Sequence, residues 1–234
     1  MSLLPPLSQL HCTITFNKFG HPVDGDVGEL LSSWVPTQED LFQGLYDGGI
    51  LLDIDWRCWN EVTRPDRWRG FGIRGVRAAV YDWEEPVIAW MANDLKQLRA
   101  ALTLADDWCL AVGRGGSAQE PFPQLNNNVV RDRLSSLDRV QTLDQLERAG
   151  ALGQDMYVAR YGEKLTLQVD WRVIEDLQGA VGEPYDFRGF KLRLSDLRSP
   201  DWPVIEWAAV TFAELHSALS AIDQWVHAEL LGHG

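Results

Sequence analysis

Cysteine is scarce in this chain, which has 234 residues and three cysteines: Cys12, Cys58 and Cys109. An odd, small number does not make a disulfide framework, and no two of them have the close spacing of a zinc or redox motif. In the internal repeat described below, Cys58 and Cys109 each align with a valine. We therefore interpret the cysteines as small core residues, and we expect no metal site and no cofactor.

Long apolar runs are also absent. No stretch approaches the ~18 consecutive apolar residues that a membrane-spanning helix needs. Residues 1–6 contain neither a basic leader nor an apolar segment, so no secretory signal is expected. The predicted location is the cytoplasm.

Basic residues are in the minority. The 21 Lys and Arg residues face 34 Asp and Glu residues, which gives a formal net charge of −13. A nucleic-acid binder needs a basic footprint, and an anionic membrane repels an acidic protein. We therefore expect neither nucleic acid nor membrane as a partner. A basic protein partner fits this charge, as does simple solubility.

The chain instead contains one ordered series of sequence blocks twice. Residues 52–57 (LDIDWR) resemble 167–172 (LQVDWR), and 69–71 (RGF) repeat at 188–190. The series continues with two further pairs, 86–90 (PVIAW) with 203–207 (PVIEW), and 95–108 with 212–225. Because the order is kept and three tryptophans align, we interpret the chain as a tandem duplication.

Each copy predicts a small antiparallel sheet followed by a helix. Residues 52–57 alternate between apolar and polar, which is typical of a half-buried strand, and 71–74 predict a neighbouring strand. The two helices are expected to begin at the capping boxes 94–97 and 211–214. A short capped helix is expected over 142–150, and 37–44 is interpreted as its counterpart. A strand is expected near residues 10–16.

The predicted fold class is therefore α+β: a tandem duplication of a small antiparallel sheet covered by a C-terminal amphipathic helix. We predict a first repeat with an N-terminal extension over residues 1–112, a linker over 113–138 and a second repeat over 139–234. Whether the two sheets merge into one stays open.

Tryptophan is unusually frequent, with 11 residues. An aromatic surface for stacking bases or sugars is one interpretation. Core packing is the preferred one, because the repeated tryptophans fall at inward-facing positions.

No catalytic constellation recurs in both copies. His216, Asp223 and His227 share one stripe of the last helix, but only the aspartate persists in the first copy, as Asp106. We interpret this as a helix-surface ion pair.

The polar faces of the predicted strands are the candidate binding surface. One interpretation is cross-strand salt bridging. The other is a charged face presented to a partner, with eight candidate binding residues: Asp53, Asp55, Arg57, Asp82, Glu84, Glu85, Asp170 and Arg172.

The series of blocks resembles the immunity proteins of bacterial polymorphic-toxin systems. It consists of a strand ending in Asp-Trp-Arg, an Arg-Gly-Phe strand, a Trp-Pro or Glu-Pro loop and a capped helix. The similarity covers residues 51–112 and 165–230. It implies a stoichiometric binder that occludes a toxin, and it assigns no contact residues.

Three functions therefore remain in view. The first is a non-catalytic, immunity-like inhibitor of a basic toxin or effector, present as a monomer or homodimer. The second is an enzyme with an acidic site at the repeat junction, built from Asp24, Asp26, Asp53 and Asp55, with a metal-dependent mechanism as one option. The third is an assembly protein that pairs through its sheet edges.

Overall fold

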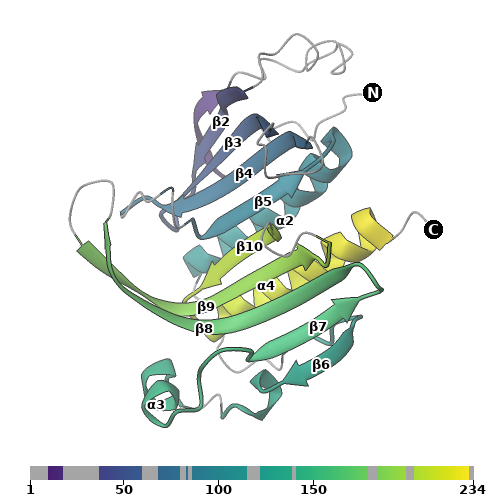
Figure 1. Cartoon of the computed structure of the whole chain (residues 1–234). Helices are drawn as coiled ribbons and strands as arrows, with labels where there is room; N and C mark the ends of the chain where they lie inside the picture. The colour runs from purple at the N-terminus through teal and green to yellow at the C-terminus, as the bar shows by residue number, and fades with distance from the viewer. Residues whose placement is uncertain are drawn as a thin grey trace.

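The fold is α+β, with a ten-stranded antiparallel sheet and helices packed on it (Figure 1). The computed structural model describes residues 10–17, 37–59, 68–79, 83, 86–114, 122–138, 141–178, 184–198 and 203–231. Within these residues, no helix is both long and apolar enough to cross a membrane.

In the described part of the first half, the structure has five strands and one long helix. These are β1 (Thr13–Asn17), β2 (Thr37–Leu45), β3 (Ile50–Trp59), β4 (Trp68–Arg77), β5 (Ile88–Ala92) and α2 (Leu95–Arg114). The second half adds β6 (Asn128–Asp132), the 3-10 turn η2 (Leu134–Ser136), α3 (Leu143–Arg148), β7 (Tyr157–Tyr161), β8 (Leu165–Gln178), β9 (Pro184–Asp196), β10 (Pro203–Ala209), α4 (Phe212–Trp225) and the π-helical turn η3 (Val226–Leu231).

All ten strands form one sheet, so the two predicted sheets merge. Its order is β1-β2-β3-β4-β5-β10-β9-β8-β7-β6, and β5 and β10 are the pair that joins the halves. In that pair Trp90 lies opposite Ile205 and Trp207 lies opposite Ile88, with Ala89 facing Glu206 in the middle. The strand order is therefore symmetric about the β5–β10 pair.

Alternation along the strands places one set of side chains against the helices. In β3, Leu52, Ile54 and Trp56 belong to the core, as do Leu167, Val169 and Trp171 in β8. The tight turns before these strands need glycine. Gly49 and Gly162 have positive φ angles of 74° and 58°, which residues with a Cβ rarely adopt.

Both long helices begin where the capping boxes were predicted. The Asp94 carboxylate accepts the backbone N–H of Gln97 at 2.8 Å, and the Thr211 hydroxyl accepts that of Glu214 at 3.1 Å. In each box the glutamine or glutamate side chain reaches back one residue further than the standard pattern. Gln97 Oε1 accepts the Asn93 N–H at 2.9 Å, and Glu214 Oε2 accepts the Val210 N–H at 2.8 Å.

Four tryptophans pack between the sheet centre and the two long helices. The ring centroids of Trp90 and Trp207 lie 5.5 Å apart, those of Trp90 and Trp225 lie 5.4 Å apart, and those of Trp108 and Trp207 also lie 5.4 Å apart. All four are at most 2% exposed. The preference for core packing over a stacking surface is confirmed for these residues, and the junction between the halves is a solid aromatic core.

Two predicted elements differ from the structure. The short helix interpreted over residues 37–44 is wrong, because Thr37–Leu45 is strand β2. Residues 113–138, expected to be a linker, contain η2 and β6, and β6 is paired with β7. All five β6 residues are exposed, so the strand lacks the apolar alternation that would have marked it.

Candidate functional site

Three of the predicted aspartates, Asp53, Asp55 and Asp170, lie on the sheet face opposite α2 and α4, which we call the outer face. They are buried there: Asp53 is 3% exposed, Asp55 1% and Asp170 6%. Arg57 lies in β3, but its side chain is outside the described residues, as are Asp82, Glu84 and Glu85. The structure therefore brings together part of the predicted surface, with its carboxylates below the surface.

Arginines cover two of these carboxylates. Arg74 Nη2 lies 2.8 Å from Asp55 Oδ2, between neighbouring strands β4 and β3. Arg172 Nη2 lies 2.7 Å from Asp170 Oδ2, two residues away in β8. The Arg172 side chain is 43% exposed and that of Asp170 only 9%. Aspartate side chains are short and stay close to the sheet, whereas the longer arginine side chains extend to solvent.

Asp170 is further held by neutral donors. Its Oδ1 accepts the Asp155 backbone N–H at 2.7 Å and the Gln168 amide at 3.2 Å. In the first half, Asp53 accepts a hydrogen bond from the Gln43 amide at 3.2 Å. A buried carboxylate with such partners has its hydrogen-bonding capacity satisfied within the fold.

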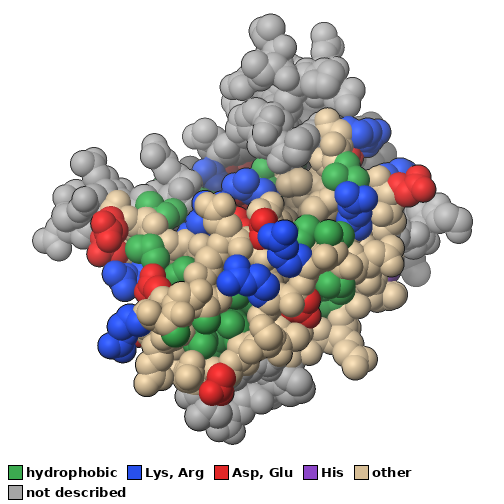
Figure 2. Space-filling model, turned by 60° about the horizontal axis from the view of Figure 1, so that its bottom comes forward, with side chains coloured by type: hydrophobic (Ala, Val, Ile, Leu, Met, Phe, Trp, Pro, Cys, Tyr) green, Lys and Arg blue, Asp and Glu red, His purple; other side chains and the backbone are tan. Residues whose placement is uncertain are grey.

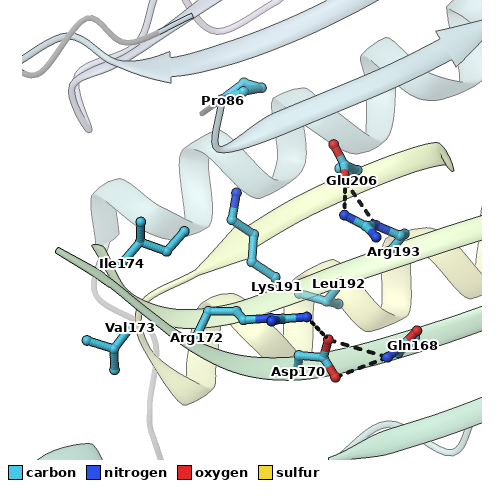
Figure 3. A pocket seen from close by; sticks show the side chains of 10 residues that line it. All are labelled: Pro86, Gln168, Asp170, Arg172, Val173, Ile174, Lys191, Leu192, Arg193 and Glu206. Atoms are coloured by element: carbon cyan, nitrogen blue, oxygen red, sulfur yellow. Dashed lines mark hydrogen bonds and ion pairs between the residues drawn. The ribbon is translucent and has the colours of Figure 1, made fainter. Parts of the chain in front are cut away.

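A hollow of about 490 Å³ opens on the outer face over β8, β9 and β10 (Figure 3). Pro86, Val173 and Ile174 lie among its lining residues. Its polar and charged lining consists of Gln168, Asp170, Arg172, Lys191, Arg193 and Glu206. Two residues of the predicted surface, Asp170 and Arg172, thus line the hollow.

The far side of the hollow carries a second ion pair. Arg193 in β9 lies directly opposite Glu206 in β10, and its Nε donates to Glu206 Oε1 at 3.0 Å. Lys191 Nζ lies 5.3 Å from the centroid of the Phe187 ring, a cation–π contact. Figure 2 shows Lys and Arg side chains gathered in the middle of one face, with a few Asp and Glu between them.

On the other side of the sheet, an aspartate in each long helix accepts a tyrosine hydroxyl. Asp106 of α2 accepts the Tyr46 hydroxyl at 2.7 Å and the His11 backbone N–H at 2.9 Å. Its other oxygen lies 2.7 Å from His11 Nδ1.

Asp223 of α4 has the same arrangement. It accepts the Tyr161 hydroxyl at 2.9 Å and the Asn126 backbone N–H at 3.0 Å. The predicted ion pair with His227 is looser, at 3.8 Å. Sequence reasoning missed the tyrosines, which each come directly before the glycine-containing turn that leads into β3 or β8. These contacts fasten the start of each half to its helix.

Burial determines the ionisation of the tyrosines and cysteines near Asp106 and Asp223. It raises the pKa of Tyr46 and Tyr161 above the ordinary tyrosine value. It also raises the pKa of the Cys109 thiol, and that of Cys12 with help from the Asp106 charge. A thiol with a raised pKa is a poor nucleophile, and Cys109 is a buried core residue as expected. The Cys58 side chain is outside the described residues.

The structure gives no metal-binding cluster in its described part: no three His, Cys, Asp or Glu residues there are placed to hold an ion. Asp24 and Asp26, proposed as ligands of an acidic enzyme site, lie outside the described residues. The aromatic core fills the junction at which that site was expected.

Comparison with known proteins does not assign a function. No family model, no curated protein and no solved structure matches this chain.

Proposed function

We propose that this protein is a non-catalytic binding protein that acts as an immunity-like inhibitor in the cytoplasm and occludes a toxin or effector with its outer face. One observation carries the proposal: an open hollow with exposed arginines lies on a sheet face whose carboxylates are already satisfied. Such a surface is rigid and charged, which suits recognition of a partner.

The proposed duplication supplies the frame for this surface. It is supported by the symmetric strand order and by contacts that recur in both halves. The Trp56 and Phe71 rings have centroids 5.1 Å apart at 69°, and those of Trp171 and Phe190 are 5.1 Å apart at 72°. Helix-bound tyrosines recur in the same way at Asp106 and Asp223.

The net charge of −13 favours a partner that is basic as a whole. Opposite net charges accelerate the encounter of two proteins, and this effect falls as the salt concentration rises. Binding alone would then inhibit, since a bound partner has its own active surface covered.

Growth of bacteria that express the product of the neighbouring gene tests the proposal. That product should arrest growth, and co-expression of this protein should restore it. A double variant, Lys191→Glu with Arg193→Glu, should lose the protection because it reverses the charge of the hollow. Lys164→Glu in the exposed β7–β8 turn makes the same kind of charge change away from the hollow and should still protect. A harmless neighbour, or arrest that persists with the wild-type protein, would refute the proposed function.

A further inference from the structure

The charge that the hollow presents to solvent is opposite in sign to that of the whole chain. Three cations line it, Arg172, Lys191 and Arg193, against two carboxylates, Asp170 and Glu206. Each carboxylate already has an arginine partner, at 2.7 Å for Asp170 and 2.9 Å for Glu206. The Arg193 side chain is 54% exposed. With three cations against two carboxylates, the lining carries a net positive charge, and the arginine side chains are more exposed than the carboxylates they pair with.

The cations come from neighbouring strands and lie close together. Lys191 is directly opposite Asp170 in the β8–β9 register, and Arg193 is opposite Gln168. Adjacent strands lie about 4.8 Å apart, and alternate residues on one strand about 7 Å. Figure 3 shows Arg172 directed along the sheet toward the middle of the hollow, between Asp170 and Lys191. One short polypeptide segment could contact all three heads.

The matching place in the first half is built differently. Gly72 lies opposite Asp55, where the second half has Lys191 opposite Asp170. Ala89 lies opposite Arg74, where the second half has Glu206 opposite Arg193. The Arg74 guanidinium also lies 5.4 Å from the centroid of the Trp83 ring. The cationic hollow is therefore a feature that the second half has in addition to the shared sheet.

We infer that the hollow over β8–β10 binds the carboxylates of an acidic segment on the protein partner. This inference rests on the proposed function and adds the chemistry of the contact. Guanidinium groups recognise carboxylates through paired hydrogen bonds, and an ammonium adds a point charge. The partner is then basic as a whole, which brings it to this acidic protein, and it carries a local acidic segment that docks. A nucleic acid is disfavoured because its uniform negative charge meets a net charge of −13.

Titration of the ¹⁵N-labelled full chain with short peptides, followed by amide chemical shifts, tests the inference. At low ionic strength, capped hexaglutamate should shift amides of β8, β9 and β10, and hexalysine should not. The double variant Lys191→Gln with Arg193→Gln should weaken hexaglutamate binding by about fivefold or more, because two exposed ion pairs with the peptide are lost. Lys164→Gln should bind as the wild type does. Both glutamine substitutions leave Asp170 with its Arg172 partner, so the fold is expected to persist. The amide spectra of the variants show directly whether they are folded.

Three results would overturn the inference. One is the absence of shifts in β8–β10 with hexaglutamate. Another is binding that the double variant leaves unchanged. The third is tighter binding of a six-nucleotide thymidine strand at the same amides, which would make the hollow a nucleic-acid surface. If hexaglutamate fails while growth protection by the outer face holds, only the acidic segment is refuted. If hexaglutamate binds while the neighbouring gene product is harmless, only the inhibitor role is refuted.

Discussion

Replacing Asp106 by alanine removes one carboxylate that holds three parts of the first half together. Its oxygens contact the Tyr46 hydroxyl at 2.7 Å, the His11 backbone N–H at 2.9 Å and His11 Nδ1 at 2.7 Å. Asp106 is 5% exposed and Tyr46 is 2% exposed. Water therefore has little access to the tyrosine hydroxyl once its acceptor is gone.

The expected loss of stability follows from these contacts. A buried donor left without its acceptor costs about 1–3 kcal/mol, and hydrogen bonds to a charged group are worth more than neutral ones. We expect Asp106→Ala to lower the free energy of unfolding by about 3 kcal/mol. For a chain of this length that corresponds to a fall in melting temperature of roughly 6–12 °C. Asp223→Ala should cost about 2 kcal/mol, because its Oδ1 accepts two such hydrogen bonds and its side chain is more exposed.

Calorimetry or thermal circular dichroism measures both variants, and Asp107→Ala is the matched control. Asp107 is the next residue in α2 and is exposed, so its removal should shift the melting temperature by no more than about 2 °C. The proposed role of the buried aspartate is refuted if Asp106→Ala has the same melting temperature as the control. It is also refuted if Asp106→Ala and Asp223→Ala lose the same stability.

Three further predictions concern pH, thiol reactivity and the core. The pKa values of Tyr46 and Tyr161 are raised in the folded protein, so both tyrosines stabilise the fold below pH 10. Above pH 10 the free energy of unfolding should fall by up to about 1.4 kcal/mol per pH unit for each tyrosine. Tyr46→Phe should make this fall with pH less steep in urea unfolding at alkaline pH. Cys109 should resist alkylation at pH 8 in the native protein and react fully in guanidinium, as peptide mass spectrometry would show; rapid native labelling would contradict its burial. Trp207→Ala should destabilise the protein by about 3–5 kcal/mol in urea unfolding, and a loss below about 1 kcal/mol would contradict the central position of this ring.

The parts of the fold that follow from local rules could be predicted from the sequence. Alternation marked β3 and β8, since Leu52 and Leu167 each begin a period-two run that ends in Asp-Trp-Arg. Capping residues marked both helix starts, because Asp94 and Thr211 satisfy backbone N–H groups that no helix can satisfy by itself.

Elements without a buried face could not be predicted in the same way. β6 is exposed throughout, so its identity depends on pairing with β7, which is distant in the sequence. Residues 37–44 have the spacing of a capped helix, but tertiary pairing with β1 and β3 makes them a strand.

The sheet face that carries Asp55 and Asp170 was predicted, but the charge that it exposes was not. Alternation correctly places Asp55 and Asp170 on the face away from the helices. The interpretation as cross-strand salt bridging is confirmed for Arg74 and Asp55, which lie on neighbouring strands, whereas Arg172 reaches Asp170 along the same strand. The exposed charge of such a face depends on side-chain length as well as on composition.

Calorimetric titration of the purified protein with the product of the neighbouring gene tests the central claim most directly. We predict one-to-one binding that weakens by at least about a hundredfold in the Lys191→Glu, Arg193→Glu variant, and by less than about threefold in Lys164→Glu. Equal affinity of all three proteins, or no binding by the wild type, would contradict recognition through the outer face.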